Sequence, residues 1–164
     1  MKRTAATALV CAIGLFGLAA PAGAAKAAQE TATLTIDAST GSGTVTAAGA
    51  FAGTGTVDTL KSKTAGRTHH FVEKLTFGSD TITIKAVTVR RSRTIDSSTC
   101  AVTETDKGVW KIASGTGGFA KAKGHGHLVA TANVTGTPDA TKPHGCDFSK
   151  LTGTITVDAK GRVK

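Results

Sequence analysis

The chain has 164 residues and a formal net charge of +9, with 20 lysines and arginines against 11 acidic residues. This length suits one domain with a single core. Aromatic residues make up only 4% of the chain and do not alternate with the basic ones, so the composition argues against a surface that stacks nucleic-acid bases. A basic protein is attracted to anionic polymers or acidic lipids, although the same charge could serve only to keep it in solution.

Residues 1–24 have the pattern of a secretory signal peptide. Lys2 and Arg3 precede an apolar run over residues 5–20, and an Ala-Gly-Ala cleavage pattern closes the segment. The run is short for a membrane span, which needs about 20 residues. An uncut N-terminal anchor and cleavage a few residues later are the alternatives. We therefore expect a secreted protein, and the Ala-, Thr- and Gly-rich composition suggests a bacterial source.

Two cysteines lie outside the apolar run, Cys100 and Cys146. In an exported protein an even pair indicates one disulfide bond. Two unpaired buried thiols are the alternative. One bridge cannot replace a core, so apolar packing must carry most of the stability.

After the signal peptide we expect a short disordered tail over residues 25–30 and a folded domain over residues 31–164. Apolar and polar residues alternate along most of that domain, which is typical of half-buried strands. Strands are expected near residues 32–36, 43–48, 51–60, 69–77, 81–90, 109–114, 125–134 and 151–158, with polar loops over 61–68 and 135–147. A change of phase at Val87 predicts a bulge or a bend in one strand. Short strands separated by turns, without a convincing helix, predict an all-β barrel or sandwich.

Residues 110–124 read as a strand, a tight glycine turn and the start of another strand. Trp110 and Ile112 share one face of the first strand, because alternate residues of a strand point the same way. Gly115, Gly117 and Gly118 allow a positive φ or a close approach of the backbone. We interpret this stretch as structural, since no helix follows it to bind a phosphate group.

Residues 112–124 resemble the GGTG-x-F-x-x-A-x-G stretch of plant dirigent proteins, related forms of which occur in secreted bacterial proteins with an allene oxide cyclase-like barrel. Residues 51–57 and 151–155 are similar to an early strand and the last strand of that group. The resemblance implies a single antiparallel β-barrel of about eight strands, often trimeric in the plant members. The chain departs from the pattern at Ser114, where Gly is frequent, and at Lys123, where Arg is usual. The catalytic residues of the plant families find no match here, so the resemblance implies no activity.

Glu73 is the candidate catalytic residue. It shares a strand face with Phe71, Leu75 and Phe77, which should point into a core or a lumen. Burial raises the pKa of a carboxyl group, as a general acid or base requires. The alternatives are an outward face near a barrel end and an ion pair with a basic neighbour. We expect Phe71, Leu75, Phe77 and Arg90 to contact a small apolar ligand.

Arg90, Arg91 and Arg93, together with Lys85, form a basic cluster that could hold a phosphate or an anionic polymer. A solvated loop is the alternative interpretation of this cluster. The G-x-S-x-G motif of a hydrolase nucleophile is not present, so hydrolase chemistry has little support.

His125 and His127 lie two residues apart and point the same way on a strand. This spacing could ligate zinc with His69, His70 or His144 as a third ligand. No carboxylate or cysteine ligand lies nearby in the sequence, so we expect neither a metal nor a cofactor.

Three functional hypotheses follow. The first is a secreted β-barrel that binds a small apolar ligand or associates with the cell envelope. The second is a dirigent- or cyclase-like enzyme, or stereochemical guide, that acts on such a ligand through Glu73. The third is a structural surface protein that binds anionic wall polymers. A buried Glu73 beside an open cavity favours the second hypothesis, and a filled lumen counts against it. We expect no nucleic-acid partner, and the resemblance implies a homo-oligomer.

Overall fold

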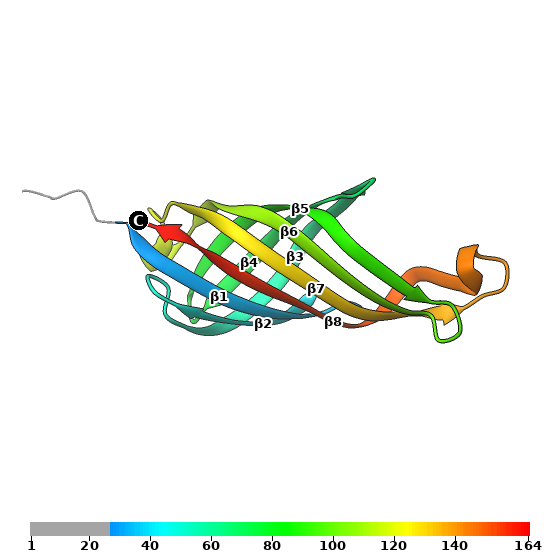
Figure 1. Ribbon diagram of the computed structural model, residues 1–164. Coiled ribbons are helices and arrows are strands. Elements are labelled where there is room, and N and C mark those ends of the chain that lie inside the picture. Colours follow the sequence, from blue (N-terminus) through cyan, green and yellow to red (C-terminus); the bar gives the residue numbers. More distant parts are fainter. Residues whose placement is uncertain (1–26) are drawn as a thin grey trace, which may run out of the picture.

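The computed structural model describes residues 27–164 as one antiparallel sheet of eight strands that closes on itself (Figure 1). Each strand pairs with the next along the chain, and β8 pairs with β1. The strands are β1 (Ala28–Asp37), β2 (Ser42–Ala48), β3 (Gly53–Ala65), β4 (Thr68–Phe77), β5 (Asp80–Asp96), β6 (Ala101–Gly115), β7 (Gly124–Pro138) and β8 (Cys146–Val163). The prediction of an all-β fold built from antiparallel strands is confirmed. The predicted signal peptide, residues 1–24, lies outside the described residues.

Alternate residues of every strand point into the closed sheet, which we call the barrel, and form its core. One cluster joins β1 to β4 and contains Leu34, Ile36, Val45, Val57 and Leu75. A second cluster contains Ala86, Trp110, Leu128 and Val163. Threonines occupy many outward positions, where a β-branched polar side chain suits both the strand and the solvent.

The predicted disordered tail over residues 25–30 is wrong from Ala28 onward. β1 begins at Ala28, which lies opposite Val163 of β8. Glu30 is only 4% exposed and points into the barrel, on the same face of β1 as Ala32 and Leu34. Ala28 and Gln29, which precede it, pair with β8 through their backbones, and side-chain composition alone does not reveal such pairing.

The predicted loop over residues 61–68 is also wrong. β3 continues to Ala65 and β4 starts at Thr68, so only a short turn at Gly66 separates them. Lys61 and its successors up to Ala65 are exposed in this hairpin, which projects at one end of the barrel in Figure 1. Because neither face of the hairpin tip is buried, the sequence there lacks the apolar alternation that predicts a strand.

β5 is longer and more regular around Val87 than its sequence predicts. Val87 and Val89 stay in register with β6 and point outward, 37% and 39% exposed. The register between β5 and β6 shifts instead between Thr83 and Ile84 and between Arg90 and Ser92. The phase change in the sequence therefore marks exposed valines, not a bulge.

The disulfide bond Cys100–Cys146 is confirmed, with 46 residues of separation. Cys100 is the last residue of the β5–β6 turn, directly before β6, and Cys146 begins β8. Both cysteines are buried, and the two loops that they join lie at the same end of the molecule in Figure 1. No helix of the described part of the chain is both long and apolar enough to cross a membrane.

The glycine turn is a short 3-10 segment, Gly117–Phe119, and not a tight hairpin. Gly117 has a φ of 55°, and a Cβ atom there would collide with the carboxylate of Asp80. That carboxylate accepts a hydrogen bond of 2.9 Å from the Gly118 N–H. The ring of Phe119 packs edge-on against Phe51 and Phe77. The turn thus places an aromatic group at one end of the barrel, as expected for a structural element.

Candidate functional site

The barrel encloses an apolar cavity of about 230 Å³. Its wall includes the predicted ligand-binding residues Phe71, Leu75 and Phe77, together with Trp110 from β6. Arg90, the fourth predicted ligand-binding residue, is not among the lining residues and lies beyond one end of the cavity. The lumen is therefore neither fully packed nor polar, which leaves room for a small apolar molecule.

Glu73 points from the middle of β4 into this cavity. Its side chain is buried, with the residue 8% exposed, and its Oε2 atom has no hydrogen-bond partner among the described residues. Burial is the main reason that its pKa is raised above 4.5; the charge of Asp58 raises it further, while the Thr59 hydroxyl opposes the shift. In residues 27–164 no cation lies within ion-pair distance of Glu73.

Glu30 is a second cavity carboxyl group, which sequence reasoning missed. Its Oε2 atom accepts a hydrogen bond of 3.2 Å from the Phe51 N–H, and its Oε1 atom has no partner in the described structure. Burial raises its pKa, and hydrogen bonds from the backbone of Phe51 and Ala50 partly oppose this. Its inward position could have been predicted from the sequence, because Glu30 lies two residues before Ala32 in the alternating pattern of β1.

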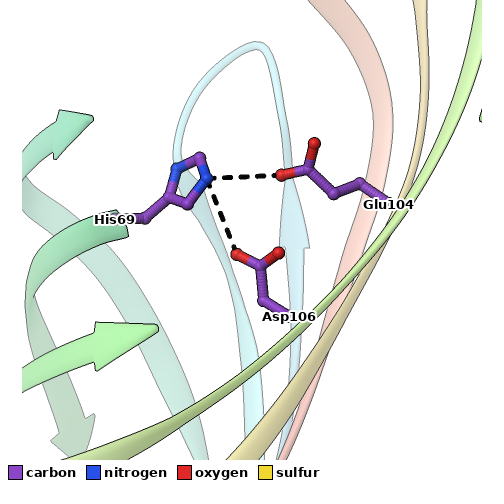
Figure 2. Close-up of side chains that lie close together, drawn as sticks. All are labelled: His69, Glu104 and Asp106. Atoms are coloured by element: carbon purple, nitrogen blue, oxygen red, sulfur yellow. Dashed lines mark ion pairs between the residues drawn. The ribbon is translucent and has the colours of Figure 1, made fainter. Parts of the chain in front are cut away.

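A polar cluster of His69, Glu104 and Asp106 lies near one end of the cavity (Figure 2). The Nε2 atom of His69 lies 3.4 Å from Glu104 Oε1 and 3.8 Å from Asp106 Oδ2. Thr88, which lines the cavity, donates a hydrogen bond of 2.9 Å to Asp106 Oδ2. One hydroxyl thus connects the apolar cavity to a charged network.

Two arginines neutralise this polar cluster. The Nε atoms of Arg90 and Arg93 lie 2.8 and 3.5 Å from Glu104 Oε2. Arg90 also places its Nη2 atom 3.4 Å from His69 Nε2. Two guanidinium groups therefore already pair with one of the two carboxylates, Glu104, and would repel a divalent cation added here. We interpret the cluster as an ion-pair network that closes one end of the barrel.

The structure does not bring together the histidines considered as zinc ligands. His125 and His127 are exposed on β7, opposite Arg162 and Lys160 of β8. His69 is instead half-buried beside two carboxylates. Those acids, Glu104 and Asp106, belong to the inward series of β6 that leads to Trp110, a periodicity that the sequence shows but that sequence reasoning did not follow.

The predicted basic cluster is divided between the two faces of β5, and the register shift between Arg90 and Ser92 brings Arg93 to the same side as Arg90. Arg90 and Arg93 pair with Glu104, whereas Lys85 and Arg91 are exposed. The alternative interpretation, a solvated loop, is wrong, because β5 continues to Asp96.

Comparison with protein families, curated proteins and solved structures finds no match to this chain. The chemistry of the site therefore has to be inferred from its geometry.

The cavity carboxyls predict how stability depends on pH. A folded-state pKa above 4.5 for Glu73 means that the folded protein binds this proton more tightly than the unfolded chain. The free energy of unfolding should therefore fall as pH rises from below 4.5 through the folded-state pKa. The variant Glu73→Gln should lose this part of the slope, while Glu30 keeps its own. Urea unfolding at a series of pH values measures it.

The exposed Asp96 affects the free energy of unfolding in a different pH range. Hydrogen bonds from Ser98 and Thr99 lower the pKa of Asp96 to about 2, so its contribution to stability is lost only as pH falls below 3.8. The outcome that would contradict a raised pKa at Glu73 is an equal dependence on pH. It would be seen if, above pH 4.5, the free energy of unfolding changed with pH equally in the wild type and in Glu73→Gln.

Proposed function

We propose that this protein is an exported binding protein that holds a small, mainly apolar molecule carrying one polar oxygen inside its barrel. One observation carries the proposal: an open apolar cavity contains a buried carboxyl oxygen of Glu73 that has no partner in the described structure. An engineered cavity of about 150 Å³ binds benzene, so a cavity of about 230 Å³ suits a somewhat larger molecule.

The carboxyl group would make binding specific for ligands that can form a hydrogen bond with it. A protonated Glu73 has one O–H to donate and still accepts at its other oxygen. A buried polar atom without a partner costs free energy that a ligand hydroxyl or carbonyl would recover. The apolar walls, including Leu75 and Trp110, would bind the rest of the molecule.

Export and family membership are parts of the same proposal. The N-terminal pattern and the Cys100–Cys146 bridge support an oxidising, extracellular location. The closed sheet of eight antiparallel strands is compatible with the resemblance to dirigent and allene oxide cyclase-like barrels. Assembly into a trimer stays a prediction of that resemblance.

Trp110 provides a direct measurement of binding. It is the single tryptophan of a chain without tyrosine, and it lines the cavity. We expect menthol to change its emission, and p-menthane, which has the same body without the hydroxyl, to bind about 2- to 10-fold more weakly. Neither compound absorbs where tryptophan is excited.

Two variants give this experiment its controls. Glu73→Leu should remove the preference for menthol while still binding p-menthane, because only the polar partner is lost. Asp158→Asn, which removes an exposed carboxylate, should leave both affinities unchanged. Emission of Trp110 unaffected by either compound, with neither retained in native mass spectrometry, would overturn the proposal.

A second candidate function is acid catalysis on the bound molecule. The buried Glu73 beside an open cavity specifically favours it, because burial raises the pKa of this carboxyl group, so it keeps a proton to donate at a higher pH than an exposed carboxyl does. With limonene oxide as an acid-labile probe, Glu73 would protonate the epoxide oxygen as its C–O bond breaks. Water would add to the carbon and return a proton to the carboxylate, giving the diol. Diol formation at the same rate with Glu73→Gln would exclude this role.

A further inference from the structure

The outer surface of β7 and β8 carries basic side chains opposite one another. His125 faces Arg162 and His127 faces Lys160 in the register of the two strands. Just beyond the end of the ladder, Lys123 and Lys164 exchange two backbone hydrogen bonds of 2.9 Å. Three successive outward-facing pairs across the two strands therefore consist only of lysine, arginine and histidine.

The same row of basic residues continues onto the neighbouring strands. Lys111 of β6 lies opposite His125, and Lys85 of β5 lies opposite Lys111. All these side chains are exposed. We call this surface the basic face and define it by its six cations, Lys85, Lys111, Lys123, Lys160, Arg162 and Lys164.

The protein's own acids leave the basic face unneutralised. Within residues 27–164, every ion pair is formed by His69, Arg90 or Arg93, and no lysine lies within 4.0 Å of a carboxylate. The nearest acid along β8, Asp158, accepts a hydrogen bond of 2.8 Å from the Thr33 hydroxyl. The positive charge of this surface is therefore available to another molecule.

The fold itself does not need these cations. Like charges that face each other on neighbouring strands destabilise a sheet. Outward positions of β1 and β2, such as Thr33 and Thr46, carry threonine in the same kind of site. A concentration of cations on one side of the barrel is thus better explained by binding than by folding.

We propose that the basic face binds a linear anionic polymer of polyol phosphate units, which lies across β5 to β8. Outward residues repeat about every 6.8 Å along a strand and about every 4.8 Å between strands, so the cations form an array that can meet several phosphates of one chain. Lysine suits this as a point charge for phosphate. Val109, 51% exposed, lies on the same outer face of β6 as Lys111 and opposite His127, and can contact the CH groups of a polyol.

Other occupants fit this surface less well. The basic face has no Phe or Trp on which bases could stack, since Trp110 points inward. A second copy of this chain presenting the same face would bring like charges together. The proposal does not depend on the cavity, because the basic face lies on the outer surface of the sheet.

The experiment compares two triple variants that lose the same charge. The first changes the basic face through Lys111→Thr, Lys160→Thr and Arg162→Thr. The control changes three other exposed lysines, Lys61, Lys63 and Lys150, to threonine. A synthetic glycerol phosphate oligomer of about ten units is titrated against each protein at a series of salt concentrations.

We expect the basic-face variant to bind the oligomer at least about tenfold more weakly than the wild type near 50 mM salt. Its slope of log K against log salt should be smaller by about 2, since each lost phosphate contact removes about 0.7. The control triple should change both quantities less. Monomeric glycerol phosphate should not compete, because it cannot span the array.

Three outcomes would overturn the proposal. They are wild-type affinity in the basic-face variant, an equal loss in the two triples, and equal or tighter binding of single-stranded DNA of the same length. Thermal unfolding of both triples checks that they are folded. Unchanged binding of menthol by the basic-face variant separates a failure here from a failure of the cavity proposal.

Discussion

We expect Trp110→Ala to lower the free energy of unfolding by about 3–5 kcal/mol. Trp110 is 6% exposed and packs with Ala86, Leu128 and Val163. Its ring lies so close to the backbone of β8 that a Cβ atom on Gly161 would be 2.5 Å from Cζ2. The barrel already contains a cavity, and removing the indole would enlarge it. Urea unfolding followed by circular dichroism measures the loss, since the variant has no tryptophan.

Trp110→Phe is the matched variant. It keeps an aromatic ring in the cluster and removes the indole N–H, which is buried and has no hydrogen-bond partner in the described structure. We expect a loss of less than about 1.5 kcal/mol, because the unpaired donor disappears together with part of the volume. Equal losses for the alanine and phenylalanine variants would show that the ring does not support the barrel.

The second large effect is expected at the disulfide bond. A double variant with alanine at Cys100 and Cys146 should lose about 4 kcal/mol, the chain-entropy value for a loop with this separation. The buried positions of both cysteines make alanine preferable to a polar residue. Urea unfolding of the oxidised wild type, the reduced wild type and the double variant gives the comparison.

The reduced wild type and the double variant should agree within about 1 kcal/mol, since both lack the same constraint. Without the bridge, the structure should open first near the two loops that the bridge joins, because these loops lie beyond one end of the barrel (Figure 1). Amide exchange should rise near Ala101 and Asp147 before it rises in the middle of β1. A double variant as stable as the oxidised wild type would contradict the prediction.

Strand alternation in the sequence predicted much of the barrel interior. Phe71, Glu73 and Leu75 share one face, and the structure places all three at the cavity. The pairing of Cys100 with Cys146 also followed from the sequence, because only these two cysteines lie outside the apolar N-terminal run. These features depend on the local periodicity of the sequence or on the number of cysteines, and both can be obtained from a single sequence.

The polar end of the barrel could not be predicted in the same way. Glu104 and Asp106 meet His69 only because β4, β5 and β6 are neighbours in the closed sheet, which the sequence does not state. Strand ends at the rim, such as residues 61–65, are exposed on both faces and therefore lack an apolar pattern. A polar stretch of this kind predicts a loop, although here it forms a hairpin.

The pairing of β1 with β8 has a consequence for the order of folding. The other seven strand pairings join neighbours in sequence, and only this one joins the two ends of the described chain. Until β8 is in place, β1 and β7 each present an unpaired edge on which another chain could add. A variant shortened before Cys146, which lacks β8, should therefore aggregate during refolding more readily than one altered in a hairpin turn. Protection against self-association is thus acquired last, when the C-terminal strand docks.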